Sequence, residues 1–339
     1  MSSAESTTRI GEFHEATARL KDAIGRVVVG QELVIEEVLI CLFAGGHVLV
    51  EGVPGLGKTL LVRTLGQAMD LQFSRIQFTP DLMPSDIIGT NMLVEDEHGR
   101  KRFELSRGPI FSQLVLADEI NRATPKTQSA LLEAMAEHSV TIAGTRHDLR
   151  QPFFVLATEN PIEMEGTYPL PEAQLDRFLF KVLVPQPDEQ TLVGILDRTT
   201  GTAQATAPRT LDGPSVLSLR GLVREVAIAD PLMRYVARLV RASDPSLEGA
   251  ATAAKSFLRY GAGVRGGQSI VLAAKVRALM EGRAHVSFAD LRRVALPALR
   301  HRIIPNFEAE ADGVSPDTIV DKILAEVPEV PRSVATMAS

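Results

Sequence analysis

The strongest constraint on this chain is an eight-residue run over 52–59 that reads Gly-Val-Pro-Gly-Leu-Gly-Lys-Thr. It fits the pattern G-x-x-x-x-G-K-[ST] and stands between a strand-like run over 47–51 and a helical pattern over 58–69, the context that the pattern requires. Glycines allow backbone N–H groups to curl around phosphate oxygens, and the start of a helix adds partial positive charge. The run therefore predicts a phosphate-binding loop made by Val53, Pro54, Gly55, Leu56, Gly57, Lys58, Thr59 and Leu60.

Two side chains of this loop have separate expected roles. Lys58 would reach the β- and γ-phosphates of a nucleotide, and Thr59 would offer its hydroxyl to Mg²⁺. A further apolar run, over 114–117, ends in Asp118 and Glu119. At the end of a sheet strand beside the loop, Asp118 would orient the water around Mg²⁺ and Glu119 would polarise a water for in-line attack. These residues predict that ATP and Mg²⁺ bind and that the ATP is hydrolysed.

A third polar position follows the apolar run over 153–157. Asn160 stands there in the string Ala-Thr-Glu-Asn-Pro. Its amide would hold the attacking water or a γ-phosphate oxygen, and the alternative is a turn-forming asparagine before Pro161.

Short apolar runs alternate with helical patterns between residues 33 and 184. The runs are rich in Val, Leu and Phe, as strands buried on both faces of a parallel sheet are. They cover 47–51, 73–77, 114–117, 153–157 and 180–184. This alternation predicts an α/β fold with right-handed crossovers. Two pairs of strand-like arms with turn residues between them, 90–94 with 101–105 and 139–142 with 145–149, predict inserted β-hairpins.

The C-terminal part of the chain has a helical pattern. A Thr-, Ala-, Gly- and Pro-rich stretch over 200–215 is typical of a linker or surface loop. Apolar residues then recur at i, i+3, i+4 and i+7 over 219–226 and 232–240, and Ser287 and Asp290 resemble a capping box. The expected units are an N-terminal helix and linker (1–30), an α/β domain (31–185), a linker and helical lid (186–305) and an acidic tail (306–339).

Composition limits the classes of protein that remain. With 339 residues the chain has room for about two domains. Its one cysteine, Cys41, excludes an intrachain disulfide and lies in an apolar run that predicts a buried thiol. The start of the chain lacks the layout of a secretory signal and no apolar run reaches the roughly 20 residues of a membrane span, so we expect a soluble, cytoplasmic protein without membrane insertion.

The net charge of −6 conceals an uneven distribution. Residues 1–213 carry 19 basic and 29 acidic side chains, whereas 214–305 carry 15 and 6, and 306–339 carry 2 and 7. The basic segment is either a set of solvated helix faces or a docking surface for the acidic body of a neighbouring subunit. Few aromatic residues stand among the basic ones, so nucleic-acid binding is not favoured.

Several long strings together resemble the MoxR-type AAA+ ATPases over about residues 10 to 305. Besides the loop at 52–59, they are Val-Val-Gly-Gln at 28–31, Gln-Phe-Thr-Pro-Asp-Leu-Met-Pro-Ser-Asp at 77–86, Ala-Asp-Glu-Ile-Asn-Arg-Ala at 117–123, Ala-Thr-Glu-Asn-Pro at 157–161, Glu-Gly-Thr-Tyr at 165–168 and Pro-Glu-Ala-Gln-Leu-Asp-Arg-Phe at 171–178. The resemblance implies a P-loop AAA+ sheet domain with two inserted hairpins, followed by a small helical lid domain.

The resemblance also implies roles for single residues. Asn160 matches the sensor 1 position, and Val29 and Gly30 fall where the linker passes the adenine. Arg177 matches the arginine finger that reaches the nucleotide of a neighbouring subunit, with Arg122 as the other candidate. Without the resemblance, Arg177 would be read as the salt-bridge partner of the adjacent Asp176.

Sensor 2 falls at Arg265 in the resemblance. Family members often have Ser-Pro before this arginine, and Gly263 and Val264 stand here instead. The alternative is a solvated arginine in a glycine-rich loop.

The function that follows is ATP hydrolysis coupled to remodelling of a client protein. The resemblance implies a homo-oligomeric ring, commonly a hexamer, with ATP between the sheet domain and the lid, a chaperone-like task and a partner that often has a von Willebrand factor A domain. Two other classes stay open: a nucleotide-dependent switch or scaffold with little turnover, and a nucleic-acid motor whose ATPase DNA would stimulate in a salt-sensitive way.

Overall fold

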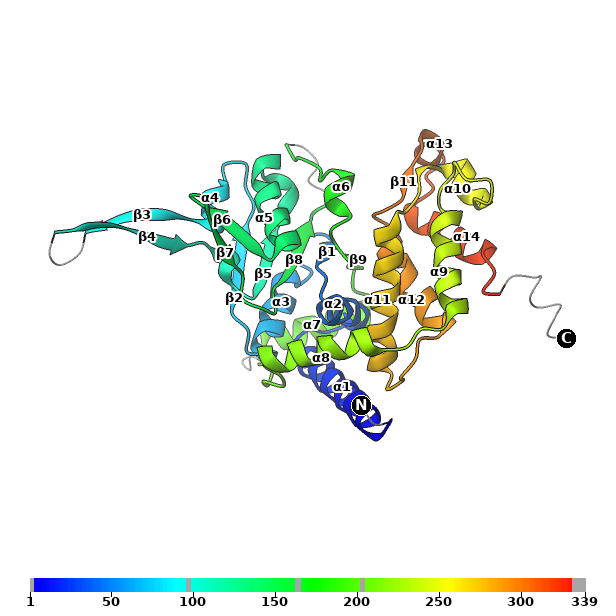
Figure 1. Ribbon diagram of the computed structural model, residues 1–339, viewed down its shortest axis with the longest axis horizontal. Helices are drawn as coiled ribbons and strands as arrows, with labels where there is room; N and C mark the ends of the chain where they lie inside the picture. The colour runs from blue at the N-terminus through cyan, green and yellow to red at the C-terminus, as the bar shows by residue number, and fades with distance from the viewer. Residues whose placement is uncertain (1–2, 96–98, 162–165, 202–204, 331–339) are drawn as a thin grey trace.

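The computed structural model describes residues 3–95, 99–161, 166–201 and 205–330 (Figure 1). Its centre is a sheet of five parallel strands in the order β2-β5-β8-β1-β9. The strands are β1 (Val48–Glu51), β2 (Phe73–Gln77), β5 (Leu114–Asp118), β8 (Phe154–Glu159) and β9 (Phe180–Leu183). The α/β prediction and all five expected strands are confirmed, with small differences at the strand ends.

The three central strands, β5, β8 and β1, are buried on both faces, which explains their continuous apolar runs. Leu114 and Leu116 of β5 belong to one hydrophobic core, and Val115 and Ala117 belong to the other. All four are fully buried, because neighbouring side chains of a strand point to opposite faces. Helices therefore cover both faces, as the crossovers between parallel strands require.

Helices α1 (Ser3–Gly25) and α2 (Glu32–Ala44) of the sheet domain precede β1, and its other helices and short turns come after that strand in the chain. These others are α3 (Lys58–Ala68), α4 (Pro84–Ile88), η1 (Pro109–Phe111), η2 (Ile120–Arg122), α5 (Pro125–Glu137), α6 (Glu172–Leu175) and α7 (Glu189–Thr200). Helix α7 falls in the region expected to be linker and lid, and it lies instead beside the loop that follows β1.

Both expected hairpins are present. Strands β3 (Gly89–Glu95) and β4 (Lys101–Arg107) pair antiparallel, as do β6 (Ser139–Ile142) and β7 (Thr145–Asp148). The β3–β4 ribbon extends far from the body of the molecule (Figure 1). Residues 96–98, between the two arms of this hairpin, lie outside the described residues.

The lid is helical, as expected. Its elements are α8 (Gly213–Glu225), α9 (Asp230–Ala242), α10 (Thr252–Phe257), β10 (Leu258–Tyr260), α11 (Val264–Met280), α12 (Phe288–Leu299), β11 (Ile304–Pro305), α13 (Phe307–Ala311) and α14 (Pro316–Glu326). No described helix is both long and apolar enough to cross a membrane.

The structure differs from the expected acidic tail over 306–339. Helices α13 and α14 lie within this range, and α14 packs against α10 and α12. Ile319, Val320 and Ile323 of α14 are buried in the same core as the rest of the lid. Most acidic residues of this segment are exposed, whereas Asp317 pairs with Arg300 of the lid at 3.0 Å and Glu326 accepts a hydrogen bond from Thr252 at the start of α10. The count of charges did not reveal the apolar stripe that folds the segment onto the lid.

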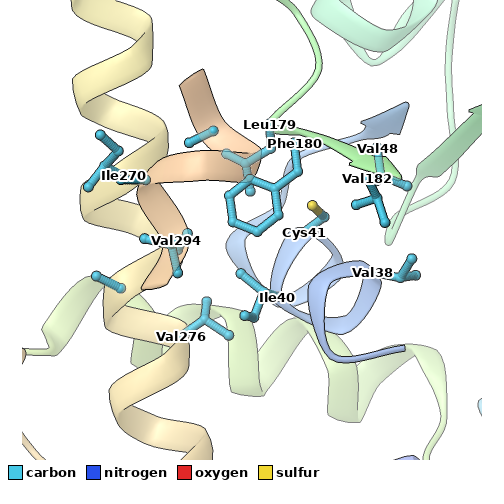
Figure 2. Close-up of a cluster of buried hydrophobic side chains, with 14 of the residues drawn as sticks. Val38, Ile40, Cys41, Val48, Leu179, Phe180, Val182, Ile270, Val276 and Val294 are labelled. Atoms are coloured by element: carbon cyan, nitrogen blue, oxygen red, sulfur yellow. The ribbon is translucent and has the colours of Figure 1, made fainter. Parts of the chain in front are cut away.

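The lid and the sheet domain share one hydrophobic core. Cys41 of α2 lies in it with Phe180 of β9, and Ile270 and Val294 of α11 and α12 complete the cluster from the lid side (Figure 2). Burial raises the pKa of the Cys41 thiol well above its ordinary value, so the thiol stays neutral. The prediction of a buried structural thiol is confirmed.

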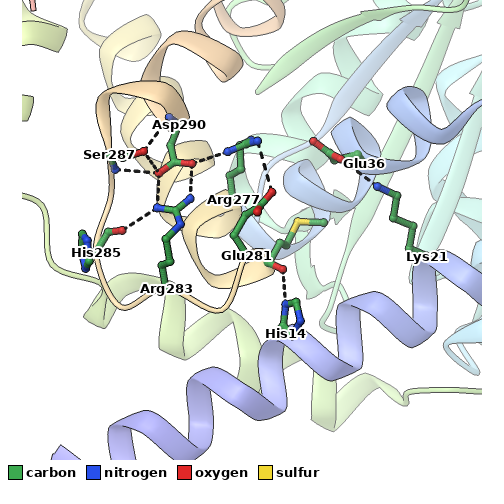
Figure 3. Close-up of polar contacts among 10 residues, drawn as sticks. His14, Lys21, Glu36, Arg277, Glu281, Arg283, His285, Ser287 and Asp290 are labelled. Carbon is green, nitrogen blue, oxygen red and sulfur yellow. Dashed lines mark hydrogen bonds and ion pairs between the residues drawn. The ribbon is translucent and has the colours of Figure 1, made fainter.

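The predicted capping box at the start of α12 is part of a larger polar network (Figure 3). The carboxylate of Asp290 is fully buried and accepts hydrogen bonds from Arg277 at 2.6 Å and from Arg283 at 2.7 Å. It also accepts from the backbone N–H and the hydroxyl of Ser287, at 2.8 and 2.7 Å. Burial alone would raise the pKa of Asp290, but these hydrogen bonds outweigh it and lower the pKa from 3.8 to about 2.

We expect Asp290→Asn to destabilise the lid strongly. The change leaves two partly buried arginines without their carboxylate, a loss of about 3 kcal/mol in the free energy of unfolding. Because the folded pKa is below the unfolded value, the stability that Asp290 contributes is present above pH 3.8 and is lost as the pH falls toward about 2. Urea unfolding of wild type and variant should therefore differ at neutral pH and converge in acid. Asp321→Asn, at an exposed position of α14, is the control, and an equal loss in both variants would contradict the network's role.

Candidate functional site

The predicted phosphate-binding loop joins the end of β1 to the start of α3 at the sheet edge where the parallel strands end. Gly57 has φ +73°, in the left-handed region that favours glycine, and it precedes the first helical residue, Lys58. No side chain caps the N-terminus of α3, so its first N–H groups remain directed at the loop. This is the strand–loop–helix geometry that the sequence predicted for binding phosphate.

Lys58 folds over this loop. Its ammonium group donates hydrogen bonds to the carbonyl oxygens of Gly52 and Val53, the latter at 3.3 Å. Burial lowers the pKa of Lys58, while the nearby carboxylates of Asp118 and Glu119 act in the opposite direction. The ammonium group therefore lies between the loop and the two acidic residues, where a phosphate chain and its metal would be bound.

Asp118 is held in a fixed orientation at the end of β5. Its Oδ1 accepts a hydrogen bond from the Thr158 hydroxyl at 2.7 Å, and its Oδ2 accepts from Arg75 at 2.6 and 3.0 Å. A carboxylate offers about four lone-pair sites, so these bonds leave acceptor capacity for water on a metal ion. Asp118 and Thr59 are oxygen donors of the kind that Mg²⁺ prefers, and the site fits that ion.

Glu119 occupies the next position with an unusual backbone. It has φ +57° and ψ +52°, and its N–H donates to the Thr158 hydroxyl at 2.8 Å. Its carboxylate accepts hydrogen bonds from Gln77 at 2.8 Å and from Arg122 at 3.0 Å. Such left-handed residues are costly and are found where the surrounding structure fixes them, often at active sites.

Sequence reasoning missed the residues that orient the two carboxylates. Arg75 and Gln77 lie on β2, which pairs with β5 in register Gln77 to Asp118. The sequence does show that Arg75 and Gln77 are two residues apart in an expected strand, and such side chains point to the same face of a sheet. This spacing does not say which strand is the neighbour, so their partners could not be predicted.

Asn160 lies where the prediction placed it. The pairing of β8 with β1 aligns Glu159 with Glu51, and the Gly52 N–H donates to the Glu159 carbonyl at 3.4 Å. The next residue, Asn160, is therefore beside the start of the phosphate-binding loop and is 4% exposed. Its position suits a group that holds the attacking water or a γ-phosphate oxygen.

A cavity of about 610 Å³ adjoins the loop. Its walls come from the linker after α1, from the loop and from the segment that contains α7. The predicted binding residues that line it are Val29, Gly30, Val53, Pro54, Gly55, Leu56, Gly57 and Leu60. At Gly30, a Cβ would lie 2.1 Å from the Thr191 methyl group, so α7 can approach the linker only because residue 30 is glycine.

The second wall of the cavity comes from the segment 186–305 that was expected to be linker and lid, but only from its first part. None of the lining residues comes from the described lid elements α8 to α14. This wall is α7, through Thr191 and Ile195 on its inner face. Helix α7 follows β9 directly and so stays at the edge of the sheet where the strands end.

Arg177 lies at the other end of the strands, where the parallel strands begin. It precedes β9, whose first residue, Phe180, aligns with Val48 at the start of β1. The phosphate-binding loop begins only after Glu51, at the other end of these four-residue strands, which span about 13 Å. Arg177 is directed away from that loop and donates to the Leu132 carbonyl.

Arg265 accompanies Arg177 in a second cavity, of about 290 Å³. It lies in the first turn of α11 and not in a loop, and it is within 3.6 Å of Asp176. Asp176 pairs more closely with Arg302, at 2.7 Å. Among the described ion pairs, Asp176 therefore pairs with Arg265 and Arg302. The alternative interpretation, in which Arg177 is the salt-bridge partner of Asp176, does not fit these pairs.

Arg122, the other candidate for action on a neighbour, pairs with Glu119 at 3.0 Å. It thus lies at the edge that carries the phosphate-binding loop, not with Arg177. Glu165, one of the residues that carried the resemblance, lies outside the described residues.

Comparisons with known proteins agree with this geometry. Residues 47–180 match the model of the ATPase family associated with various cellular activities (AAA), and residues 250–323 match an AAA lid domain. The chain is 42% identical to Chaperone MoxR1 of Mycobacterium tuberculosis over 90% of this chain and 80% of that protein. It is 34% identical to Protein MoxR of Paracoccus denitrificans over 95% and 98% of the two chains.

A solved structure is also similar. A candidate ATPase from Cytophaga hutchinsonii superimposes with a TM-score of 0.87 and 41% identity, over 96% of this chain and 98% of that one. The likeness extends across both the sheet domain and the lid, so the arrangement of the two parts is shared with a solved protein.

Proposed function

Because the chain belongs to the MoxR family of AAA+ ATPases, we propose that it hydrolyses ATP as a ring of identical subunits and uses the resulting motion to remodel a client protein. The proposal rests chiefly on one observation. The phosphate-binding loop lies where the parallel strands end and Arg177 lies where they begin, so Arg177 can act as an arginine finger only on the nucleotide of a second copy of the chain.

ATP binding follows from the loop and its cavity. The N–H groups of the loop and of the start of α3 contact phosphate oxygens, and Lys58 transfers its hydrogen bonds from the loop carbonyls to the β- and γ-phosphates. Val29 and Gly30 contact the adenine at the other end of the cavity. Thr59 and Asp118 hold Mg²⁺, which when bound would neutralise charge on the phosphate oxygens.

Hydrolysis depends on Glu119 and Asn160. Glu119 accepts a proton from the attacking water, while Gln77 and Arg122 keep its carboxylate oriented. Asn160 holds that water, or a γ-phosphate oxygen, in line with the bond that breaks. The bond between the γ-phosphorus and the β–γ bridging oxygen is cleaved, and ADP and phosphate are released.

Arg177 and Arg265 would complete the site of the next subunit. Negative charge on the phosphoryl group is stabilised best by a cation that is already in place when the reaction occurs. A contact that joins the carboxyl ends of the strands in one copy to the amino ends in the next uses two different surfaces, so it is heterologous. Repetition of such a contact closes into a ring when the rotation between copies permits. We propose six copies, as the resemblance to ring-forming relatives implies.

Mixing subunits tests this arrangement. We expect specific ATPase activity to rise with protein concentration, and Arg177→Ala subunits to lower the activity of wild-type rings by more than their share of the mixture. Removal of a trans arginine costs about 10³-fold or more in kcat. Arg146→Ala, at an exposed site on β7, is the control. Activity that is independent of concentration, with harmless Arg177→Ala subunits, would exclude a shared site.

The client is proposed at the level of class only. A relative named as a chaperone supports a role in maturing or activating another protein. The expectation of a partner with a von Willebrand factor A domain comes from the resemblance and remains a prediction.

A further inference from the structure

The lid carries an apolar groove between α9 and α11, two helices that lie side by side (Figure 1). The groove has a volume of about 790 Å³. At its edges Met233 and Val264 are 45% and 76% exposed. Its floor is aliphatic, made by Val236, Val240, Val271 and Leu272. A contiguous apolar surface of this kind is typical of an interaction site.

The rim of this groove is basic. Arg224, Arg241 and Lys275 line it, and none of them forms an ion pair within the described part of the chain. The Lys275 ammonium donates to the backbone carbonyl of Arg224 at 3.4 Å. Burial and the neighbouring Arg224 charge both lower the pKa of Lys275. An occupant with an apolar ridge and acidic flanks would satisfy both the floor and the rim.

The outer face of α7 has this composition. None of its residues is buried in the described chain, and Val193 and Leu196 are 60% and 51% exposed. Glu189 and Asp197 stand one turn before and one turn after Val193, which places all four side chains on one side of the helix. This face is opposite Thr191 and Ile195, which line the cavity beside the phosphate-binding loop.

The two surfaces adjoin the two halves of the proposed shared site. Gln268 and Leu272 line both the groove and the second cavity that contains Arg177 and Arg265. Helix α7 is a wall of the nucleotide cavity. When the arginines of one copy approach the nucleotide of the next, the groove is carried toward α7 of that copy.

We infer that the outer face of α7 in one subunit docks into the α9–α11 groove of its neighbour. This inference rests on the proposed ring. Val193 and Leu196 fill the aliphatic floor, and Glu189 and Asp197 meet the basic rim. Helix α7 then has the nucleotide on one side and the neighbouring lid on the other, so a change at the nucleotide is transmitted to the next subunit through a single helix.

Cross-linking tests the contact directly. Cys41 is buried and its thiol is neutral, so introduced cysteines are the reactive ones. Val193→Cys and Met233→Cys variants are mixed in the presence of ATP and treated with a short bismaleimide, while ring formation is followed separately by sedimentation. We expect dimers on a denaturing gel only in the mixture. Asp321→Cys on α14, which does not line the groove, replaces Met233→Cys as the control.

The outcomes separate the two proposals. A ring with cross-linked pairs in the mixture supports the docking of α7. A ring without them, or with equal cross-linking to the α14 control, overturns the docking and leaves the ring standing. Chains that remain monomeric with ATP overturn both.

Charge reversal gives a second readout. E189K/D197K on α7, or R241E/K275E on the rim, should raise the protein concentration needed for half-maximal ATPase activity about tenfold. When the two double variants are mixed, opposite charges meet only at contacts between one variant and the other. We therefore expect the mixture to assemble at lower protein concentration than either variant alone. Unchanged assembly in both double variants would overturn the inference.

Discussion

Lys58→Ala is expected to abolish ATPase activity and to weaken ATP binding about a hundredfold or more, because each lost hydrogen bond to a charged group costs about 1.5–3 kcal/mol. Lys58 is the one cation within the loop itself, and its ammonium already lies against the loop carbonyls of Gly52 and Val53. The variant also removes the charge that faces Asp118 and Glu119, so the ion pairs with Arg75 and Arg122 would remain to offset the charge of these carboxylates beside the phosphates.

Titration with a fluorescent ATP analogue measures this effect. Arg63→Ala provides a matched control, since Arg63 is a cation on the same helix that is exposed and does not line the cavity. Unchanged affinity in Lys58→Ala would show that the run over 52–59 is not a phosphate-binding loop. Equal losses in both variants would point to damage to α3.

Glu119→Gln should separate binding from hydrolysis. The amide keeps the size of the side chain but cannot accept the proton of the attacking water, so kcat is expected to fall about 10²- to 10⁴-fold while ATP still binds. Single-turnover hydrolysis and ATP affinity, measured on the same preparation, check the two parts. Arg122→Gln is the comparison, because it removes the ion pair to Glu119 and keeps the carboxylate.

This variant also distinguishes the alternatives for function. A switch or scaffold with negligible turnover would show little hydrolysis in wild type and no difference in Glu119→Gln. A remodelling ATPase would turn over in wild type, and the variant would hold ATP and retain its client long enough for isolation. Near-normal kcat in the variant would remove Glu119 from its proposed role.

The sheet and the loop were predictable because each depends on a local pattern. The central strands of the sheet are apolar on both faces, and the loop has its own spacing between a strand and a helix. Asp118, Glu119 and Asn160 follow strands, and parallel strands end at one edge, so their proximity could be argued before any coordinates were known.

The remaining features depend on which elements become neighbours. Arg75 and Gln77 act on the carboxylates only because β2 pairs with β5. The separation of Arg177 from the loop depends on β9 lying beside β1. Helices α7 and α14 are short amphipathic segments, and their packing partners are decided by tertiary contacts rather than by their own pattern.

The core around Cys41 has a mechanical consequence. Phe180 from the sheet domain and Ile270 and Val294 from the lid are buried in one cluster (Figure 2). A hinge motion that separates the lid from the sheet domain would therefore expose these side chains to water. Each such side chain would cost about 1.5–3 kcal/mol. A subunit built in this way behaves as a single stiff block, so the force that ATP generates has to be delivered by blocks that turn against one another at the joints between them.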